Sequence, residues 1–385
     1  MSARYNRIRW LAGIGGIVLS LVLGAVPAAA FVTQTVVDAV VEFAGGTFDR
    51  TGLVNIPSEN VSGVQLMPVG LSGEWVQDAL TLPVPLQEVA AVSHGGRVYL
   101  IGGRLQTGEA TNRVFYLSVG EDGAVQSVHE GANRLPVALA GASAFVHESG
   151  GQASIYVVGG APIPRYADPW VPSKKAFRSV IDPSTGAPGP WVEEAHLLPY
   201  GLYYAARGLR GDDVYLIGGI VAMNDRPGAP LMTTSGVFRA TLDAGGAMGP
   251  WDDLVAEGGM PSMLPACYEE GVAAAQAIVY RGDSGDTIYL IGGRASAGDQ
   301  SGFSAYIHVA YADISVDGLL SQWRKSEGSL PVPLHGHGGL LVGGTEILLA
   351  GGRTDPNNPN ADLQNAVKAA LIDPDNAAFR LYDWC

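Results

Sequence analysis

A short apolar run that ends in two consecutive glycines recurs six times along this chain of 385 residues. The copies read VVEFAGG at 40–46, VYLIGG at 98–103, IYVVGG at 155–160, VYLIGG at 214–219, IYLIGG at 288–293 and ILLAGG at 347–352. Their first glycines stand at 45, 102, 159, 218, 292 and 351, which are 57, 57, 59, 74 and 59 residues apart. Such spacing indicates a repeated supersecondary unit, and units of this kind bury a core only by stacking on their neighbours.

Two further features keep the same register as the double glycine. A glycine is followed five residues later by tryptophan at Gly70/Trp75, Gly186/Trp191, Gly246/Trp251 and Gly318/Trp323. A Leu-Pro pair precedes the double glycine, with its proline at Pro83, Pro136, Pro199, Pro265 and Pro331. Each unit therefore reads as four short strands: one after Leu-Pro, one that runs into the double glycine, one beyond it, and one that starts near the tryptophan. Four-stranded antiparallel sheets repeated around an axis form a β-propeller.

This pattern resembles the kelch repeat, which is marked by the double glycine, the tryptophan of the fourth strand and a period of about 50 residues. The resemblance covers about residue 38 to the C-terminus and implies an all-β propeller of four-stranded antiparallel blades. We expect six blades, five from clear kelch units and one from a degenerate N-terminal unit. Five blades plus an N-terminal hairpin is the alternative. Kelch propellers include enzymes, adaptors and adhesive modules, so the resemblance leaves function open.

The composition agrees with this fold and excludes one class of partner. The 53 glycines and 24 prolines are poor helix formers, and charged residues make up only 16% of the chain, which suits sheets covered on both faces. The formal net charge of −14 would repel the phosphate backbone, so we expect no nucleic-acid partner. We also expect a monomer without a bound cofactor.

The N-terminus has the layout of a secretory signal peptide. Arg4, Arg7 and Arg9 precede an apolar run from Leu11 to Val26, and a small-residue cleavage site follows at 28–30. An uncleaved membrane anchor over 11–32 is the alternative, because 22 such residues can span a bilayer. We therefore divide the chain into a signal peptide or anchor at 1–30 and a kelch-type propeller at 31–385. Either reading predicts an exported domain that is extracellular, periplasmic or held at the cell surface.

The repeat also predicts where a binding site would lie. The first strand of a unit runs away from Leu-Pro and the second runs back to the double glycine, so the residues after both motifs should meet at one mouth of the central channel. The polar and aromatic residues at these positions include Gln87, Glu88, Tyr204 and Glu270. As ligand-binding candidates we select Arg104, Tyr203, Glu269, Arg294, His335, His337 and Arg353. Arginine presents paired donors that suit carboxylates and sugar hydroxyls. An internal network among these side chains is the structural alternative.

Two insertions should widen the same face. One follows Gly160 and carries Tyr166 and Trp170 amid prolines, and the other follows Gly219. Aromatic side chains on a proline-stiffened loop can stack on sugars or anchor a protein partner, or can simply pin the loop. His335-Gly-His337 invites a metal site, because alternate residues of a strand share a side. No third ligand has a defined spacing, so we expect no metal.

Three functions remain open at this stage. The first is a non-catalytic module that binds a glycan or a protein through the funnel mouth, since no nucleophile, metalloprotease or phosphate-loop motif is present. The second is a sugar-active enzyme, because the resemblance extends to exported kelch propellers that act as sialic acid mutarotases. Glu269 and His335 would then be the catalytic candidates, with Arg294 or Arg353 on a sugar carboxylate. The third is a rigid spacer whose arginines are bonded internally.

Overall fold

The computed structural model describes most of the chain from residue 80 onward. The described residues are 47–48, 54–55, 80–120, 124–162, 171–222, 230–255, 268, 270–282, 285–296, 303–342, 344–355, 367–373 and 378–382. Within these ranges all regular structure is β-strand. None of the described segments forms a helix long and apolar enough to cross a membrane. The expected signal peptide or anchor at 1–30 lies outside the described residues.

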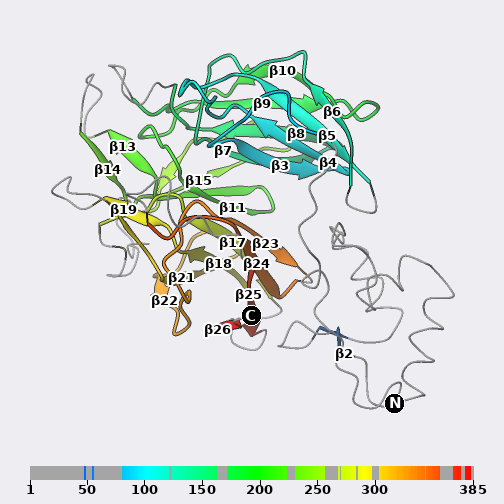
Figure 1. The fold of residues 1–385 in the computed structure, drawn as a ribbon. Helices are drawn as coiled ribbons and strands as arrows, with labels where there is room; N and C mark the ends of the chain where they lie inside the picture. The colour runs from blue at the N-terminus through cyan, green and yellow to red at the C-terminus, as the bar shows by residue number, and fades with distance from the viewer. Residues whose placement is uncertain are drawn as a thin grey trace, which may run out of the picture.

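Five four-stranded antiparallel sheets follow one another along the chain, and we name them blades A to E (Figure 1). Blade A holds β3 (Ala90–His94), β4 (Arg97–Ile101), β5 (Val114–Val119) and β6 (Val125–Glu130). Blade B holds β7 (Ser143–Ser149), β8 (Gln152–Val158), β9 (Ala176–Ile181) and β10 (Pro188–Glu193). Blade C holds β11 (Ala206–Arg210), β12 (Asp213–Ile217), β15 (Val237–Thr241) and β16 (Asp252–Asp253). Blade D holds β17 (Gln276–Gly282), β18 (Gly285–Ile291), β21 (Val309–Ile314) and β22 (Arg324–Lys325), and blade E holds β23 (Gly338–Val342), β24 (Glu346–Ala350), β25 (Val367–Asp373) and β26 (Ala378–Tyr382).

The first strands of the blades lie next to one another in sequence order. β3 contacts β7, β7 contacts β11, β11 contacts β17 and β17 contacts β23, so these five strands form the inner layer of the molecule. This order confirms an all-β propeller of antiparallel blades. The N-terminal unit contributes only β1 (Thr47–Phe48) and β2 (Val54–Asn55) to the described residues, so the sixth blade stays a prediction.

The double glycines join each blade to the next. In blades A to D both glycines have positive φ, which L side chains rarely adopt. A Cβ on Gly102, Gly159, Gly218 or Gly292 would collide with a backbone carbonyl of the following blade. The second glycine donates its N–H to that same carbonyl, for example Gly219 to Val272 at 2.7 Å. The motif is therefore glycine because the backbones of two blades touch there.

A tyrosine three residues before the first glycine bonds to the glycine ahead of the tryptophan in the next blade. Tyr99 donates its hydroxyl to the carbonyl of Gly186 at 2.9 Å, and Tyr215 donates to Gly318 at 2.7 Å. Tyr156 makes the equivalent bond to Gly246. Each bond reaches from the second strand of one blade to the outer turn of the next blade. These buried bonds align neighbouring blades at their far side from the double glycine.

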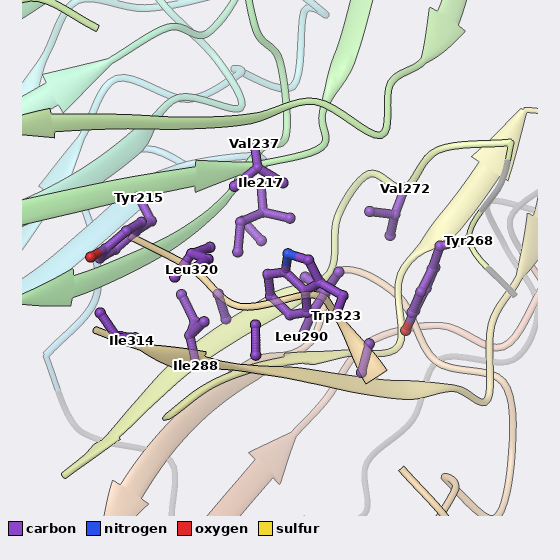
Figure 2. Packing of buried hydrophobic residues seen from close by; sticks show 14 residues of the cluster. Tyr215, Ile217, Val237, Tyr268, Val272, Ile288, Leu290, Ile314, Leu320 and Trp323 are labelled. Carbon is purple, nitrogen blue, oxygen red and sulfur yellow. The ribbon is translucent and has the colours of Figure 1, made fainter. Parts of the chain in front are cut away.

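The tryptophans pack between blades. Trp323 is buried among Ile217 and Val237 of blade C and Leu290 of blade D (Figure 2). Trp251 occupies the corresponding place in the cluster between blades B and C. The expectation that the glycine and tryptophan repeats are structural is therefore confirmed for these positions.

Candidate functional site

Residues after Leu-Pro and residues after the double glycine meet, as the strand order predicts. They form one isolated antiparallel bridge per blade: Gln87 with Arg104, Ala140 with Ala161, Tyr203 with Ile220, Ala273 with Arg294, and His335 with Arg353. We call these ten residues, with the residue that follows each first partner, the inner rim. Short hairpins continue from the rim in two blades, β13 (Ile220–Ala222) with β14 (Leu231–Thr233) and β19 (Arg294–Ser296) with β20 (Phe303–Ala305). β14 contacts β19, and both hairpins extend from the same side of the molecule (Figure 1).

A continuous backbone chain runs along the rim. Glu88, Gly141, Tyr204, Ala274 and Gly336 occupy one position of the repeat, and all have φ between 54° and 62°. Gly141 donates its N–H to Glu88, Tyr204 to Gly141, Ala274 to Tyr204 and Gly336 to Ala274, at 2.8–2.9 Å.

The rim also holds all the non-glycine residues with positive φ in the described chain, namely Glu88, Tyr204 and Ala274. A left-handed conformation costs an L residue about 1–2 kcal/mol. Such residues gather at functional sites more often than elsewhere.

Glu88 connects blades A and C across blade B. One carboxylate oxygen of Glu88 lies 2.5 Å from Nη2 of Arg104, and the other accepts the Tyr203 hydroxyl at 2.5 Å. The Tyr203 ring lies over Gly141 of blade B, where a Cβ would strike the ring. Arg104 is thus held by an internal carboxylate, as the structural alternative predicts.

An aromatic pair and a cation continue the rim into blade D. The rings of Tyr203 and Tyr204 lie 4.1 Å apart, and the guanidinium of Arg294 lies 5.7 Å from the Tyr204 ring. Arg294 is only 9% exposed. Burial raises the pKa of both tyrosines well above the usual range, so both hydroxyls stay protonated and able to donate.

His335 is the most unusual polar group of the rim. It is 6% exposed, and its Nε2 atom has no hydrogen-bond partner among the described residues. Burial, together with the positive charges of Arg294 and Arg353, lowers the pKa of His335 to about 4, although a hydrogen bond to the Asp355 backbone and the charge of Asp355 act in the opposite direction. The imidazole is therefore neutral at pH 7. A buried ring nitrogen without a partner is costly unless another group satisfies it.

The rim is polar on one side and apolar on the other. Arg104, Arg294 and Arg353 follow the double glycines of blades A, D and E. Blades B and C place Ala161 and Ile220 there, and these pack with Ala140, Tyr203 and Ala273 in a small buried cluster. The arrangement offers hydrogen-bond donors beside an apolar and aromatic surface, which is the usual character of a small-molecule site.

The structure brings five of the nine predicted site residues to the rim: Arg104, Tyr203, Arg294, His335 and Arg353. Three others, Tyr166, Trp170 and Glu269, lie outside the described residues.

His337 has a different position. It packs against the double glycines Gly292 and Gly352, and β23 begins only at Gly338. The assumption that His335 and His337 are alternate residues of an extended strand is wrong, because Gly336 between them has a φ of 62°. No group of three or more potential metal ligands occurs in the described part of the chain.

Two polar side chains of the rim, Glu88 and Tyr204, and one residue just outside it, Asp355, were not among the nine predicted site residues. Glu88 and Tyr204 stand after Leu-Pro, where the sequence places residues that should face the channel mouth, but they were not selected as candidates. Asp355 contacts His335 from two residues beyond Arg353, and no sequence pattern marks it.

Comparisons with known proteins establish the fold. No protein-family model and no curated protein matches the sequence. Among 298 matching chains of solved structure, the one titled "Structure of YjhT" superposes with a TM-score of 0.59 and 19% sequence identity. The match covers 80% of this chain and 88% of that chain. At this identity the similarity extends to the fold alone, and the chain is a β-propeller that is similar in architecture to YjhT.

Proposed function

We propose that the protein is an exported or surface-anchored kelch-type propeller that binds a glycan or a protein partner at the inner rim without catalysis. The kelch assignment rests on the six double glycines and their tryptophans, together with the propeller fold shared with YjhT. Export rests on the arginines and the apolar run of residues 1–30. The net charge of −14 suits a soluble exported domain and not a nucleic-acid binder.

The observation that carries this proposal is the unsatisfied Nε2 atom of His335 between two arginines. Arg353 is half-buried, and its side chain forms no ion pair with any described residue. A ligand with hydroxyl or carboxylate groups would complete the hydrogen bonding of both side chains. Tyr204, which is half-buried, would supply an aromatic face for the ring of a sugar or the side chain of a peptide.

A glycan array with the purified exported domain tests the proposal. We expect wild type to bind a restricted set of glycans and Arg353→Ala to lose that binding. Arg281→Ala is the matched control, because it removes the same charge from an exposed residue at the opposite end of the inner strand β17. If both variants lose glycan binding equally, or if Arg353→Ala binds normally, the inner rim is not the binding site. A pull-down assay with wild type, Arg353→Ala and Arg281→Ala tests for a protein partner in the same way.

A sugar-active enzyme, such as a sialic acid mutarotase or epimerase, is the second candidate. The neutral His335 with a free Nε2 favours it, since that atom could accept a proton from a substrate hydroxyl. A pKa near 4 makes His335 a weak base, so Glu269 would be the main acid/base group. A mutarotation assay on wild type, Glu269→Gln and His335→Gln separates the two functions. If wild type catalyses mutarotation and both variants lose that activity, the protein is an enzyme and not a binding module.

The spacer alternative is weakened by differences among the arginines. Arg104 is held by Glu88, as a spacer would require. Arg353 and the Nε2 atom of His335 have no such partner among the described side chains. A ligand at the rim would satisfy both groups, which a spacer would leave to solvent.

A further inference from the structure

Arg207 is an exception to the repeat in the inner layer of the propeller. It lies on β11 and pairs with Leu216 of β12. It stands three residues after Tyr204, and the same position in the other blades is taken by Ala91, Ala144, Ala277 and Gly339. Among the five described blades, blade C alone carries a large cationic side chain at this depth.

The Arg207 guanidinium has no counter-ion in the described structure. No hydrogen bond or ion pair joins this guanidinium to another described side chain, and the residue is half-buried. Burial lowers the pKa of Arg207, and no acidic group among the described residues opposes that shift. Arg210, on the same strand, instead donates to Asp286 at 2.6 Å. A charge in a desolvated place is costly unless an opposite charge accompanies it.

The direction of this side chain follows from the register. A Cβ on Gly339 would lie 2.6 Å from Cγ of Gln276, so this position faces the inner strand of the preceding blade. For Arg207 the preceding inner strand is β7, whose Ser143 donates to the carbonyl of Ala205 at 2.8 Å. The backbone of Arg207 thus lies about 10 Å along the inner strand from Tyr204 at a rise of about 3.3 Å per residue, and its side chain points towards the inner strand β7.

We propose that Arg207 is an anion-binding position inside the propeller and that it takes a small oxyanion, either a free one or the carboxylate of a ligand seated at the inner rim. The planar fork of arginine donates two parallel hydrogen bonds to the two oxygens of such a group, whereas a halide offers only a single acceptor atom. Ser143 on β7 stands at the repeat position of Gln276, which approaches the position of Gly339 in the next blade. The carboxylate source deepens the proposed function and rests on it, whereas a free oxyanion does not.

Thermal unfolding in sodium acetate tests the site, with acetate replacing chloride at constant ionic strength. At about ten times its dissociation constant, acetate should raise the Tm of wild type by about 2 °C or more. Arg207→Ala should lose this response, and Arg281→Ala should keep it. In chloride alone Arg207→Ala should be as stable as wild type or more stable, because it removes an unpaired charge and installs the residue of three other blades. If Arg207→Ala fails to fold, Arg207→Gln serves as the second variant.

Two outcomes overturn the site. Wild type that does not respond to acetate has no oxyanion position. A lower Tm of both Arg207 variants in chloride would show that Arg207 is paired with a carboxylate of the chain itself. To identify the source of the anion, glycans that bind on the array are compared as free acids and as methyl esters. Loss of the preference for the acid in Arg207→Ala identifies the ligand carboxylate, and retention identifies a free oxyanion. An acetate response without binding of any glycan or protein partner would leave Arg207 as a site and refute the proposed function.

Discussion

Gly218→Ala tests how the blades are joined, with Gly211→Ala as the matched control in the same blade. Both glycines have positive φ, 66° at Gly218 and 56° at Gly211, so alanine meets a similar backbone strain at each site. The surroundings differ. Nothing lies within 4 Å of a Cβ on Gly211, whereas a Cβ on Gly218 would collide with the Val272 carbonyl oxygen and lie 2.7 Å from Cγ1 of Val272.

The expected costs follow from these contacts. Gly211→Ala should lower the free energy of unfolding by about 1 kcal/mol, which is the left-handed strain alone. Gly218→Ala adds the displacement of blade D and the loss of the Gly219–Val272 hydrogen bond, worth about 1 kcal/mol or more. We expect a total of about 3 kcal/mol or more from the combined strain, overlap and lost bond.

Urea denaturation of both variants at one pH measures the difference. A cost at Gly218 that exceeds the cost at Gly211 by about 2 kcal/mol supports the interblade contact. Equal costs would show that the double glycine serves only its own turn, and the reasoning would fail.

Three further perturbations test the buried polar groups. Burial raises the pKa of Glu346 to about 7 from an ordinary 4.5. The free energy of unfolding should therefore fall as pH rises from 4.5 to 7, by up to about 3 kcal/mol. Glu346→Gln should remove this loss in urea titrations at pH 4 and 8. The pKa of His335 is lowered to about 4, so its contribution is full above pH 6.5 and falls as pH drops towards 4, again by up to about 3 kcal/mol; His335→Gln should flatten that slope, and an unchanged slope refutes the assignment. Tyr156→Phe should cost about 1 kcal/mol through the lost bond to Gly246, and an unchanged midpoint would show that this bond does not align blades B and C.

The sequence predicted the fold through residues whose spacing is fixed by contacts between blades. Glycine recurs at the position of Gly218 because a carbonyl of the neighbouring blade leaves no room for a Cβ there. Tryptophan recurs at the position of Trp323 because it fills the apolar core between two blades. The convergence of Arg104, Arg294 and Arg353 followed from strand order alone, without knowledge of any side chain.

Other features depend on geometry that spacing does not encode. The left-handed conformation of Glu88 and Tyr204 was not predictable, because glycine occupies that position in only two of the five described blades. The bond from Tyr203 to Glu88 crosses an entire blade, and it exists because Gly141 leaves room for the ring. The single glycine between His335 and His337 redirected the second histidine into the packing between blades D and E.

The crystal structure of the protein with a glycan selected on the array tests the central claim most directly. The account predicts that the ligand lies at the inner rim, with one polar atom within about 3 Å of Nε2 of His335 and another within about 3 Å of the Arg353 guanidinium. A ligand bound on the outer strands β6, β10 or β16, with the rim unchanged, would contradict it.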